Sequence, residues 1–285
     1  MKLDICQLER RCEQSIEEIL SEVIDSSNAI VTEHPGYLAH IDRGADVLMV
    51  AHMDWVDVPY RFNRDAAKTR IRCPRLDDRL GVYTILDFLP SIGIEADVLL
   101  TDDEEIGKST AKYFVPPREY KWVVEFDRRG EDVVTYDLDS ADWLDAIRGA
   151  GFNVARGSFS DICYLDSLDC CMMNVAVGYH QEHQPTCYLE ISEWKRQMVR
   201  FRRFWTRYQN VGFDQDVKPV VEYVPYKSKT NSKPTDWMWA NKPTIGYDSY
   251  KRWTNDRCLV CDDYLLVNEY ELCAACLATR NYGGR

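Results

Sequence analysis

Short apolar runs alternate with amphipathic segments along the first part of the chain. The runs that are rich in Val, Leu, Ile, Met or aromatic residues have the length of β-strands, at 29–32, 37–41, 46–51, 98–101, 122–126 and 172–177. Helices are expected between them at 78–89, 107–114 and 140–149. Strands that alternate with helices form a mostly parallel sheet with helices packed on it. The sequence therefore predicts an α/β fold, a three-layer sandwich around a mostly parallel mixed sheet.

Amphipathic helices are expected at both ends of this region. The chain opens with apolar residues at helical spacing, and we expect one helix that includes Ile5, Leu8, Cys12, Ile16, Ile19 and Val23. A second helix is expected over 192–208, with Ser192 as its N-cap and an apolar stripe from Trp194 to Tyr208. Its remaining surface is basic, and we expect that surface to face solvent rather than nucleic acid.

The chain changes character after residue 209, which we expect to end the main domain, 1–209. Residues 210–257 contain several prolines and tryptophans with little periodicity, and they are expected to form a linker or an extended arm. Residues 258–285 hold two Cys-x₂-Cys pairs, "CLVC" and "CAAC". Four thiolates spaced in this way fit a closed tetrahedral zinc site, and a segment this small gains its folding energy from the metal. We therefore expect a C-terminal zinc-ribbon-like appendage with one structural Zn²⁺ on Cys258, Cys261, Cys273 and Cys276.

Composition narrows the choice of partners and of compartment. The 285-residue chain has a net charge of −12, which argues against nucleic acid or an anionic membrane as its main partner. No apolar stretch approaches the roughly 20 residues that a membrane-spanning helix needs, and the N-terminus lacks the apolar core of a signal peptide. Eleven cysteines without an export signal indicate reduced thiols or metal ligands. We expect a cytoplasmic protein, and the sequence leaves its oligomeric state open.

Several predicted strands lead into side chains that can bind metals. Carboxyl ends of parallel strands meet at one edge of a sheet, so these side chains can converge. Histidine and carboxylate ligands without cysteine suit Zn²⁺ or another borderline divalent ion. Two such ions would also offset the repulsion within the run of four carboxylates at 102–105. The candidates are His52 and Asp54, Asp77 and Asp78, the run 102–105, Asp127, His180 and His183.

Taken in order, the motifs "AHMD", "LDDRLG", "DDEEIG", "EFDRRG" and "VGYHQEH" resemble those of the co-catalytic di-zinc exopeptidases. This family includes bacterial leucyl aminopeptidase and tripeptidase, and the resemblance covers roughly residues 1–195. It implies two catalytic Zn²⁺ ions, with His52 on one ion and His183 on the other. Asp77 would bridge both ions and precede a cis peptide bond to Asp78. The remaining ligands, one for each ion, would be Glu105 and Asp127.

The resemblance also implies how the site works. Zinc lowers the pKa of bound water toward about 7, which supplies hydroxide at neutral pH. Glu104 would be the general base, since a carboxylate that is not a ligand can take and return the proton. Asp54 would fix the ring of His52 through a hydrogen bond. Independently of the resemblance, Arg128 and Arg129 follow Asp127 directly, so one of them, Arg128 in the first place, would bind a substrate carboxylate or an oxyanion, or alternatively pair with nearby acids. Asp102 and Asp103 are expected to be solvated.

A zinc-dependent aminopeptidase acting on short peptides is the expected function. A deacylase of N-acyl amino acids would use the same metal centre, but such relatives often carry a lid domain before the last histidine ligand. The segment between Asp127 and His183 is too short for one. A non-catalytic binding protein on the same fold would be expected to have lost the base or a ligand, yet Glu104 and Glu105 are both present. His180 competes with His183 as a ligand, and the family pattern Gly-Tyr-x-x-Glu-His favours His183.

Overall fold

The structure is a computed structural model that describes residues 2–27, 29–216, 254–257 and 264–267. The chain divides into two compact units, Met1–Asp216 and Val217–Arg285. In the second unit, the described residues are two antiparallel strands, β13 (Thr254–Arg257) and β14 (Tyr264–Val267). The four cysteines expected to bind zinc and most of the expected linker lie outside the described residues. The predicted domain boundaries and the structural zinc site therefore stay predictions.

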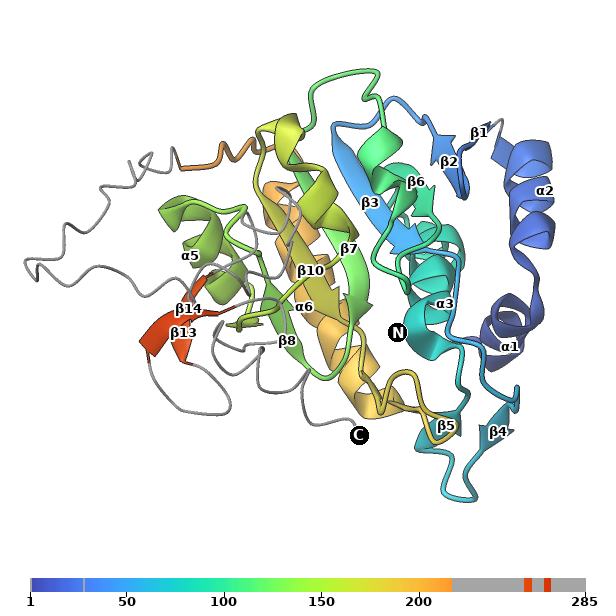
Figure 1. Cartoon of the computed structure of the whole chain (residues 1–285). Helices are drawn as coiled ribbons and strands as arrows, with labels where there is room; N and C mark the ends of the chain where they lie inside the picture. Colours follow the sequence, from blue (N-terminus) through green and yellow to red (C-terminus); the bar gives the residue numbers. More distant parts are fainter. Residues whose placement is uncertain (1, 28, 217–253, 258–263, 268–285) are drawn as a thin grey trace, which may run out of the picture. The chain divides into compact units, whose positions relative to one another are not determined.

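An eight-stranded mixed sheet forms the centre of the first unit (Figure 1). Its order is β1-β2-β6-β3-β7-β10-β8-β9, and β6, β3, β7 and β10 are parallel neighbours. The α/β fold with a mostly parallel mixed sheet is confirmed, and all six predicted strands are present. The strands are β1 (Ile30–Glu33), β2 (Tyr37–Ile41), β3 (Val47–His52), β6 (Asp97–Thr101), β7 (Trp122–Arg128), β8 (Asp132–Val134), β9 (Asn153–Val154) and β10 (Met172–Ala176).

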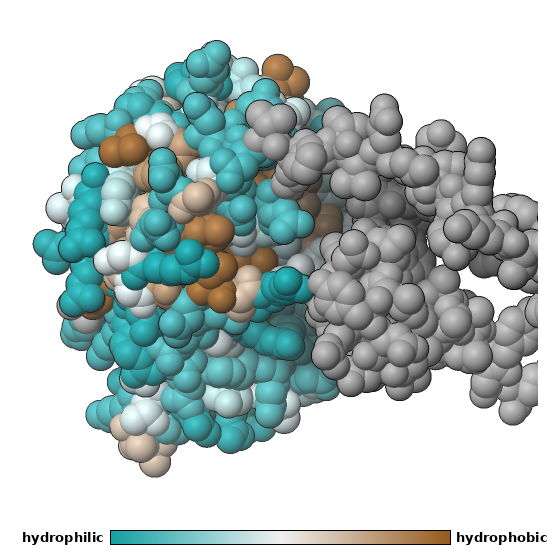
Figure 2. All heavy atoms as spheres, turned by 90° about the vertical axis from the view of Figure 1, so that its left-hand side faces the viewer, coloured by the Kyte–Doolittle hydropathy of each residue, from teal (hydrophilic) through white to brown (hydrophobic). Residues whose placement is uncertain are grey.

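The central strands are apolar along their whole length because both faces of the sheet are covered. Every residue of β3, β6 and β10 is buried. Alternate side chains of β3 point to opposite faces. Met49 and Ala51 belong to one hydrophobic cluster, whereas Leu48 and Val50 belong to another. The sheet thus separates two apolar layers. On the side of the first unit that Figure 2 shows, hydrophilic residues predominate, with a smaller group of hydrophobic residues among them.

α-Helices cover one face of the sheet, and short 3₁₀ turns cover the other. On the first face, α6 lies behind β7 and β10 in the view of Figure 1, and Trp122 of β7 packs edge-to-face on Phe204 of α6 at 5.3 Å. The helices of this layer are α1 (Ile5–Glu13), α2 (Ile16–Ser27), α3 (Leu76–Tyr83), α5 (Ala141–Gly149) and α6 (Ile191–Tyr208). The turns of the opposite layer are η2 (Thr110–Tyr113), η3 (Asp161–Tyr164) and η4 (Asp166–Leu168).

Three of the helix predictions need correction. The opening helix is two helices, because Ser15 and Glu18 form a reciprocal capping box that starts α2. The helix expected at 107–114 is only the turn η2. The last helix begins at Ile191 with Glu190 as N-cap, so Ser192 is not the cap. The helix expected at 78–89 is present as a continuous run of α3, the π-helical η1 (Thr84–Phe88) and α4 (Leu89–Ser91).

A second, four-stranded sheet was not predicted from the sequence. Its order is β11-β12-β5-β4, formed by β4 (Asn63–Arg64), β5 (Arg70–Arg72), β11 (Tyr179–His180) and β12 (Tyr188–Glu190). β5 pairs with β12, and beyond this pair the backbone N–H of Cys73 donates to the carbonyl of Cys187 at 3.1 Å. This small sheet joins the segment before Asp77 to the segment after His183.

Among the described residues, the structure contains no helix that is long and apolar enough to cross a membrane.

The packing of α6 on the sheet can be tested at Phe126. Its ring is fully buried and contacts the ring of Phe201 edge-to-face at 4.8 Å. We expect Phe126→Ala to lower the free energy of unfolding by about 3–5 kcal/mol, because it removes buried apolar area and leaves a cavity. Ile30→Ala is the control, since Ile30 is 63% exposed and should cost less than about 0.5 kcal/mol. Denaturant unfolding measures both, and equal losses would contradict this packing.

Candidate metal centre

Three neighbouring parallel strands deliver polar side chains to one edge of the main sheet. β3 ends at His52, β6 leads into the acidic run 102–105, and β7 carries Asp127 near its end. Asp77 and Asp78 lie at the start of α3, and His183 lies in the loop between β11 and β12. The five side chains expected as metal ligands, His52, Asp77, Glu105, Asp127 and His183, all meet at this edge.

These side chains form two groups that share Asp77. In the first group, Nε2 of His52 lies 3.2 Å from Oδ1 of Asp77 and 3.6 Å from Oδ1 of Asp127. In the second, Nε2 of His183 lies 3.1 Å from Oδ2 of Asp77 and 2.8 Å from Oε2 of Glu105. In each group, one donor atom from every residue lies within 4.8 Å of the others, so each group could hold a metal ion. The grouping coincides with the two ligand sets that the family resemblance implies.

Asp78 supports the turn that presents Asp77. The peptide bond between the two is cis, as the resemblance implies. Asp78 is fully buried, and its Oδ1 accepts a hydrogen bond from the backbone N–H of Gly81 at 2.8 Å. A Cβ atom at position 81 would lie 2.2 Å from Oδ2 of Asp78. The glycine of "LDDRLG" is therefore required by the close approach of this carboxyl group.

Asp54 links the ring of His52 to the acidic run. Its Oδ1 lies 3.2 Å from Nδ1 of His52, on the side of the ring opposite Asp77. The same carboxylate accepts hydrogen bonds from the backbone N–H groups of Glu104 at 3.3 Å and Glu105 at 3.1 Å. Although burial opposes it, the hydrogen bond and charge of His52 lower the pKa of Asp54. One ionised carboxylate thus orients both the imidazole and the turn that carries Glu104 and Glu105.

Glu104 lies beside both groups without belonging to either. Its Oε2 is 4.0 Å from Nε2 of His52. Burial, together with the charges of Asp161 and Asp77, raises the pKa of Glu104 to about 8. This carboxyl group can therefore exchange a proton near neutral pH.

The donor set suits divalent cations. Burial and the charge of Asp77 raise the pKa of Asp127 well above its usual value, and burial with the charge of Asp127 does the same to Asp78. Oε1 of Glu105 is buried and has no hydrogen-bond partner among the described residues. Carboxylates thus outnumber the two imidazoles, and bound dications would supply the positive charge that balances them. A dication would also give Oε1 of Glu105 the partner that it lacks. The residues fit the two zinc ions that the resemblance implies.

The expectation that Asp102 is solvated is wrong. Asp102 is only 7% exposed, and its carboxylate accepts hydrogen bonds from the backbone N–H of Tyr37 at 3.1 Å and of Asp103 at 2.9 Å. Burial raises its pKa. It anchors the turn between β1 and β2 rather than facing solvent. Asp103 is partly exposed and has a φ of +62°, so it forms the bend of the acidic run.

Arg128 pairs with a nearby acid, which is the alternative to substrate binding that the sequence left open. Its guanidinium forms a bidentate ion pair with Asp132 and donates to the carbonyl of Arg156 at 3.2 Å. His180 lies outside both ligand groups, because its Nε2 is 2.6 Å from Oε2 of Glu193. Of the two histidines of "YHQEH", it is His183 that lies against Asp77 and Glu105.

Two residues that hold Asp127 were missed. The hydroxyl of Tyr179 donates to Oδ1 of Asp127 at 3.0 Å, and the side-chain amide of Asn174 exchanges hydrogen bonds with its backbone N–H and carbonyl at 3.1 Å. Tyr179 stands in the motif "VGYHQEH", and Asn174 is the polar residue within the buried strand "MMNVA". A polar residue in a fully buried strand must find a partner, which is the signal that could have identified Asn174.

Comparison with known proteins confirms the fold. No protein-family model matches the sequence, and no curated protein matches it. Among solved structures, the Pyrococcus horikoshii TET1 peptidase superposes with a TM-score of 0.51 at 14% identity, over 70% of this chain and 98% of that one. The aminopeptidase PepT from Bacillus cereus has a TM-score of 0.52 at 12% identity, over 70% and 95%. A tripeptidase from Staphylococcus aureus has a TM-score of 0.52 at 11% identity, over 70% and 95%.

This chain has the fold of these peptidases. The resemblance to co-catalytic exopeptidases that the motifs indicate is thus matched by the three-dimensional arrangement of the first unit. At these identities the likeness concerns the fold alone, so an argument about activity depends on the side chains of the candidate metal centre.

Zinc binding should release protons from the candidate ligands. In the metal-free protein, hydrogen bonds to Asp77 and Glu105 raise the pKa of His183 to about 10, so its ring is charged near neutral pH. A metal ligand must be neutral imidazole, and binding therefore expels this proton. We expect zinc affinity to increase as pH rises through the neutral range, and calorimetry in buffers of different ionisation enthalpy should count the protons released.

Two variants locate the source of the protons. His183→Ala should release about one proton fewer, whereas His180→Ala should behave like the parent because His180 contacts Glu193 instead. The raised pKa of His183 also predicts how the free energy of unfolding of the metal-free protein depends on pH. Because the pKa of His183 is higher in the folded protein, its charged ring stabilises the fold fully below about pH 6.5. This contribution is lost as pH rises toward about 10. An unchanged proton count for His183→Ala would show that zinc binding displaces no proton from His183, and an unchanged zinc affinity as well would show that His183 is not a ligand.

Proposed function

We propose that the protein is a metal-dependent aminopeptidase that hydrolyses short peptides with two zinc ions. The observation that supports this most directly is the sharing of Asp77 between two ligand groups, with the carboxyl group of Glu104 beside them. One ion would bind His52, Asp77 and Asp127. The other would bind Asp77, Glu105 and His183. This arrangement matches the two-metal sites that catalyse hydrolysis of peptide bonds.

Each side chain then has a defined role. When bound, the ions lower the pKa of water toward about 7 and polarise the scissile carbonyl. Glu104 accepts a proton from the attacking water and returns it to the leaving amine. Asp54 keeps the ring of His52 in one orientation and, through two backbone N–H groups, holds Glu104 in place. Arg128 has no assigned contact with substrate in this proposal, because Asp132 occupies its guanidinium.

The structure of the segment between Asp127 and His183 favours an aminopeptidase over a deacylase with a lid domain. This segment forms β8, α5, β9, the turns η3 and η4, and β10, which belong to the main sheet or pack on it, and then β11 of the small sheet. No separate lid is inserted there. The solved structures with the same fold also bear the names aminopeptidase and tripeptidase. A non-catalytic role is disfavoured because Glu104 and all five candidate ligands are present together.

A substrate panel tests this function. Full-length protein loaded with zinc is assayed with amino acid p-nitroanilides, tripeptides and the matching N-acetyl amino acids. Cleavage only where the α-amino group is free supports an aminopeptidase. Cleavage only of the N-acetyl amino acids identifies a deacylase, and no cleavage of any member by the zinc-, cobalt- or manganese-loaded protein would contradict the proposed enzyme.

The role of Glu104 predicts a separation of metal binding from turnover. Glu104→Gln removes the proton carrier but leaves all proposed ligands, so metal content should stay unchanged while kcat falls by about 10²–10⁴-fold. Asp103→Asn is the matched control, because it neutralises a neighbouring carboxylate of the same acidic run and should retain most activity. Parental turnover in Glu104→Gln would eliminate Glu104 as the base.

The predicted C-terminal zinc site is tested by metal content. Cys258→Ser/Cys261→Ser in the full-length chain should lose about one zinc per molecule while the catalytic ions stay bound, because two of the four thiolate ligands are removed. Cys6→Ser is the control, since Cys6 is an exposed thiol of the first unit. Unchanged zinc in the double variant, measured by elemental analysis, would rule out the four-cysteine site.

A further inference from the structure

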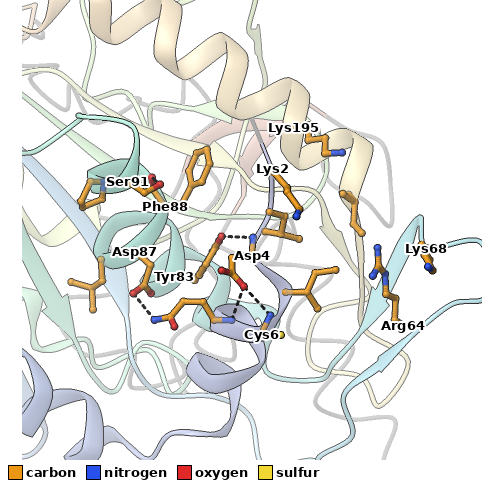
Figure 3. A pocket seen from close by; sticks show the side chains of 16 residues that line it. Lys2, Asp4, Cys6, Arg64, Lys68, Tyr83, Asp87, Phe88, Ser91 and Lys195 are labelled. Carbon is orange, nitrogen blue, oxygen red and sulfur yellow. Dashed lines mark hydrogen bonds between the residues drawn. The ribbon is translucent and has the colours of Figure 1, made fainter.

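A cavity of about 940 Å³ lies in the first unit and includes none of the candidate metal ligands. The start of α1, the segment from Tyr83 to Ser91, the first turn of α6 and the hairpin of β4 and β5 form its walls (Figure 3). Its volume lies within the range of about 300–1,000 Å³ that is usual for small-molecule sites.

Apolar side chains also line the cavity, and packing holds at least one of them in place. Ile5, Leu86 and Phe88 line the cavity, and the ring of Phe88 packs edge-to-face on the buried Trp194 at 4.5 Å. The hydroxyl of Tyr83 accepts a hydrogen bond from the backbone N–H of Asp4 at 2.9 Å, which attaches the start of α1 to α3. The rings of Phe88 and Tyr83 are therefore fixed parts of the wall.

The carboxylates that line the cavity are already engaged. Asp4 accepts hydrogen bonds from the backbone N–H groups of Cys6 and Gln7, where it caps α1. Asp87 pairs with Arg11, with Nε and Oδ2 2.7 Å apart, and accepts a hydrogen bond from the side-chain amide of Gln7 at 2.7 Å. Neither carboxylate contacts a cation of the cavity wall.

Four cations of the wall, by contrast, are unpaired. Within the part of the chain that the structure describes, the side chains of Lys2, Arg64, Lys68 and Lys195 form no ion pair or hydrogen bond, although all four line the cavity. Figure 3 shows them on one side of the cavity, with Phe88 and Ser91 on the other. Unpaired positive charge is concentrated here in a chain whose net charge is −12. An anion bound in the cavity would therefore meet positive charge that no described carboxylate neutralises.

We propose that this cavity binds a small organic anion with an apolar body. Its carboxylate, sulfonate or phosphate group pairs with the unpaired cations of the wall, Arg64 and Lys195 among them, and its apolar part packs on apolar side chains of the wall such as Phe88. The presence of both unpaired cations and apolar side chains in one wall favours this chemistry over inorganic anions or uncharged apolar molecules. The site is separate from the candidate metal centre and does not depend on the proposed peptidase activity.

The test uses the fluorescent probe 8-anilinonaphthalene-1-sulfonate and the full-length protein. We expect saturable binding that weakens as ionic strength increases, since the interaction is partly electrostatic. Arg64→Glu/Lys195→Glu should weaken binding roughly tenfold or more, because two attractive charges become repulsive. Lys112→Glu/Arg148→Glu is the matched control, because it reverses two exposed charges that line neither this cavity nor the smaller one on α6, and it should bind like the parent.

The uncharged analogue N-phenyl-1-naphthylamine separates charge from apolar contact. It should bind weakly and equally to the parent and both double variants. Parental affinity of Arg64→Glu/Lys195→Glu for the sulfonate, or an equal loss in the control variant, would overturn the proposal, as would equal affinity for the charged and uncharged probes. Circular dichroism checks folding, and Lys68→Glu alone repeats the test if the double variant does not fold.

Discussion

Repulsion among buried carboxylates is the constraint on which the rest of the first unit depends. Asp77, Asp127 and Glu104 lie close to one another in a site with only two imidazoles, and burial raises the pKa of Glu104 and Asp127. Such an arrangement costs free energy, so it persists only where the surrounding fold holds it. The buried parallel strands and the helix start at Asp77 provide that support. The apolar sheet can thus be understood as the scaffold that keeps like charges together.

Much of this scaffold is predictable from local patterns. β3, β6 and β7 are short apolar runs, and a parallel sheet places their carboxyl ends at one edge regardless of loop details. For this reason the sequence could indicate that His52, Asp127 and the acidic run converge. The spacing of "LDDRLG" likewise places Asp77 at the start of a helix, where the structure has it.

The features that the sequence did not predict depend on contacts between segments that lie far apart in the sequence. The small sheet consists of strands of two or three residues, too short to show a period, and it forms only because β5 meets β12. The burial of Asp102 follows from its hydrogen bond to Tyr37 in another part of the chain, which an acidic run cannot reveal. The break after α1 is different. The capping box of Ser15 and Glu18 is a recognisable sequence pattern. The apolar residues keep their helical spacing across it, and that spacing predicts one continuous helix instead of two.

The small sheet also connects the segment before Asp77 to the loop that carries His183 through backbone hydrogen bonds. β5 leads to Asp77, β12 follows the loop of His183, and the ladder between the strands continues into the bond from Cys73 to Cys187. A displacement of either segment therefore moves the other through these backbone hydrogen bonds, and the main sheet is not involved. The ladder accordingly limits how far the segment of Asp77 and the segment of His183 can move apart.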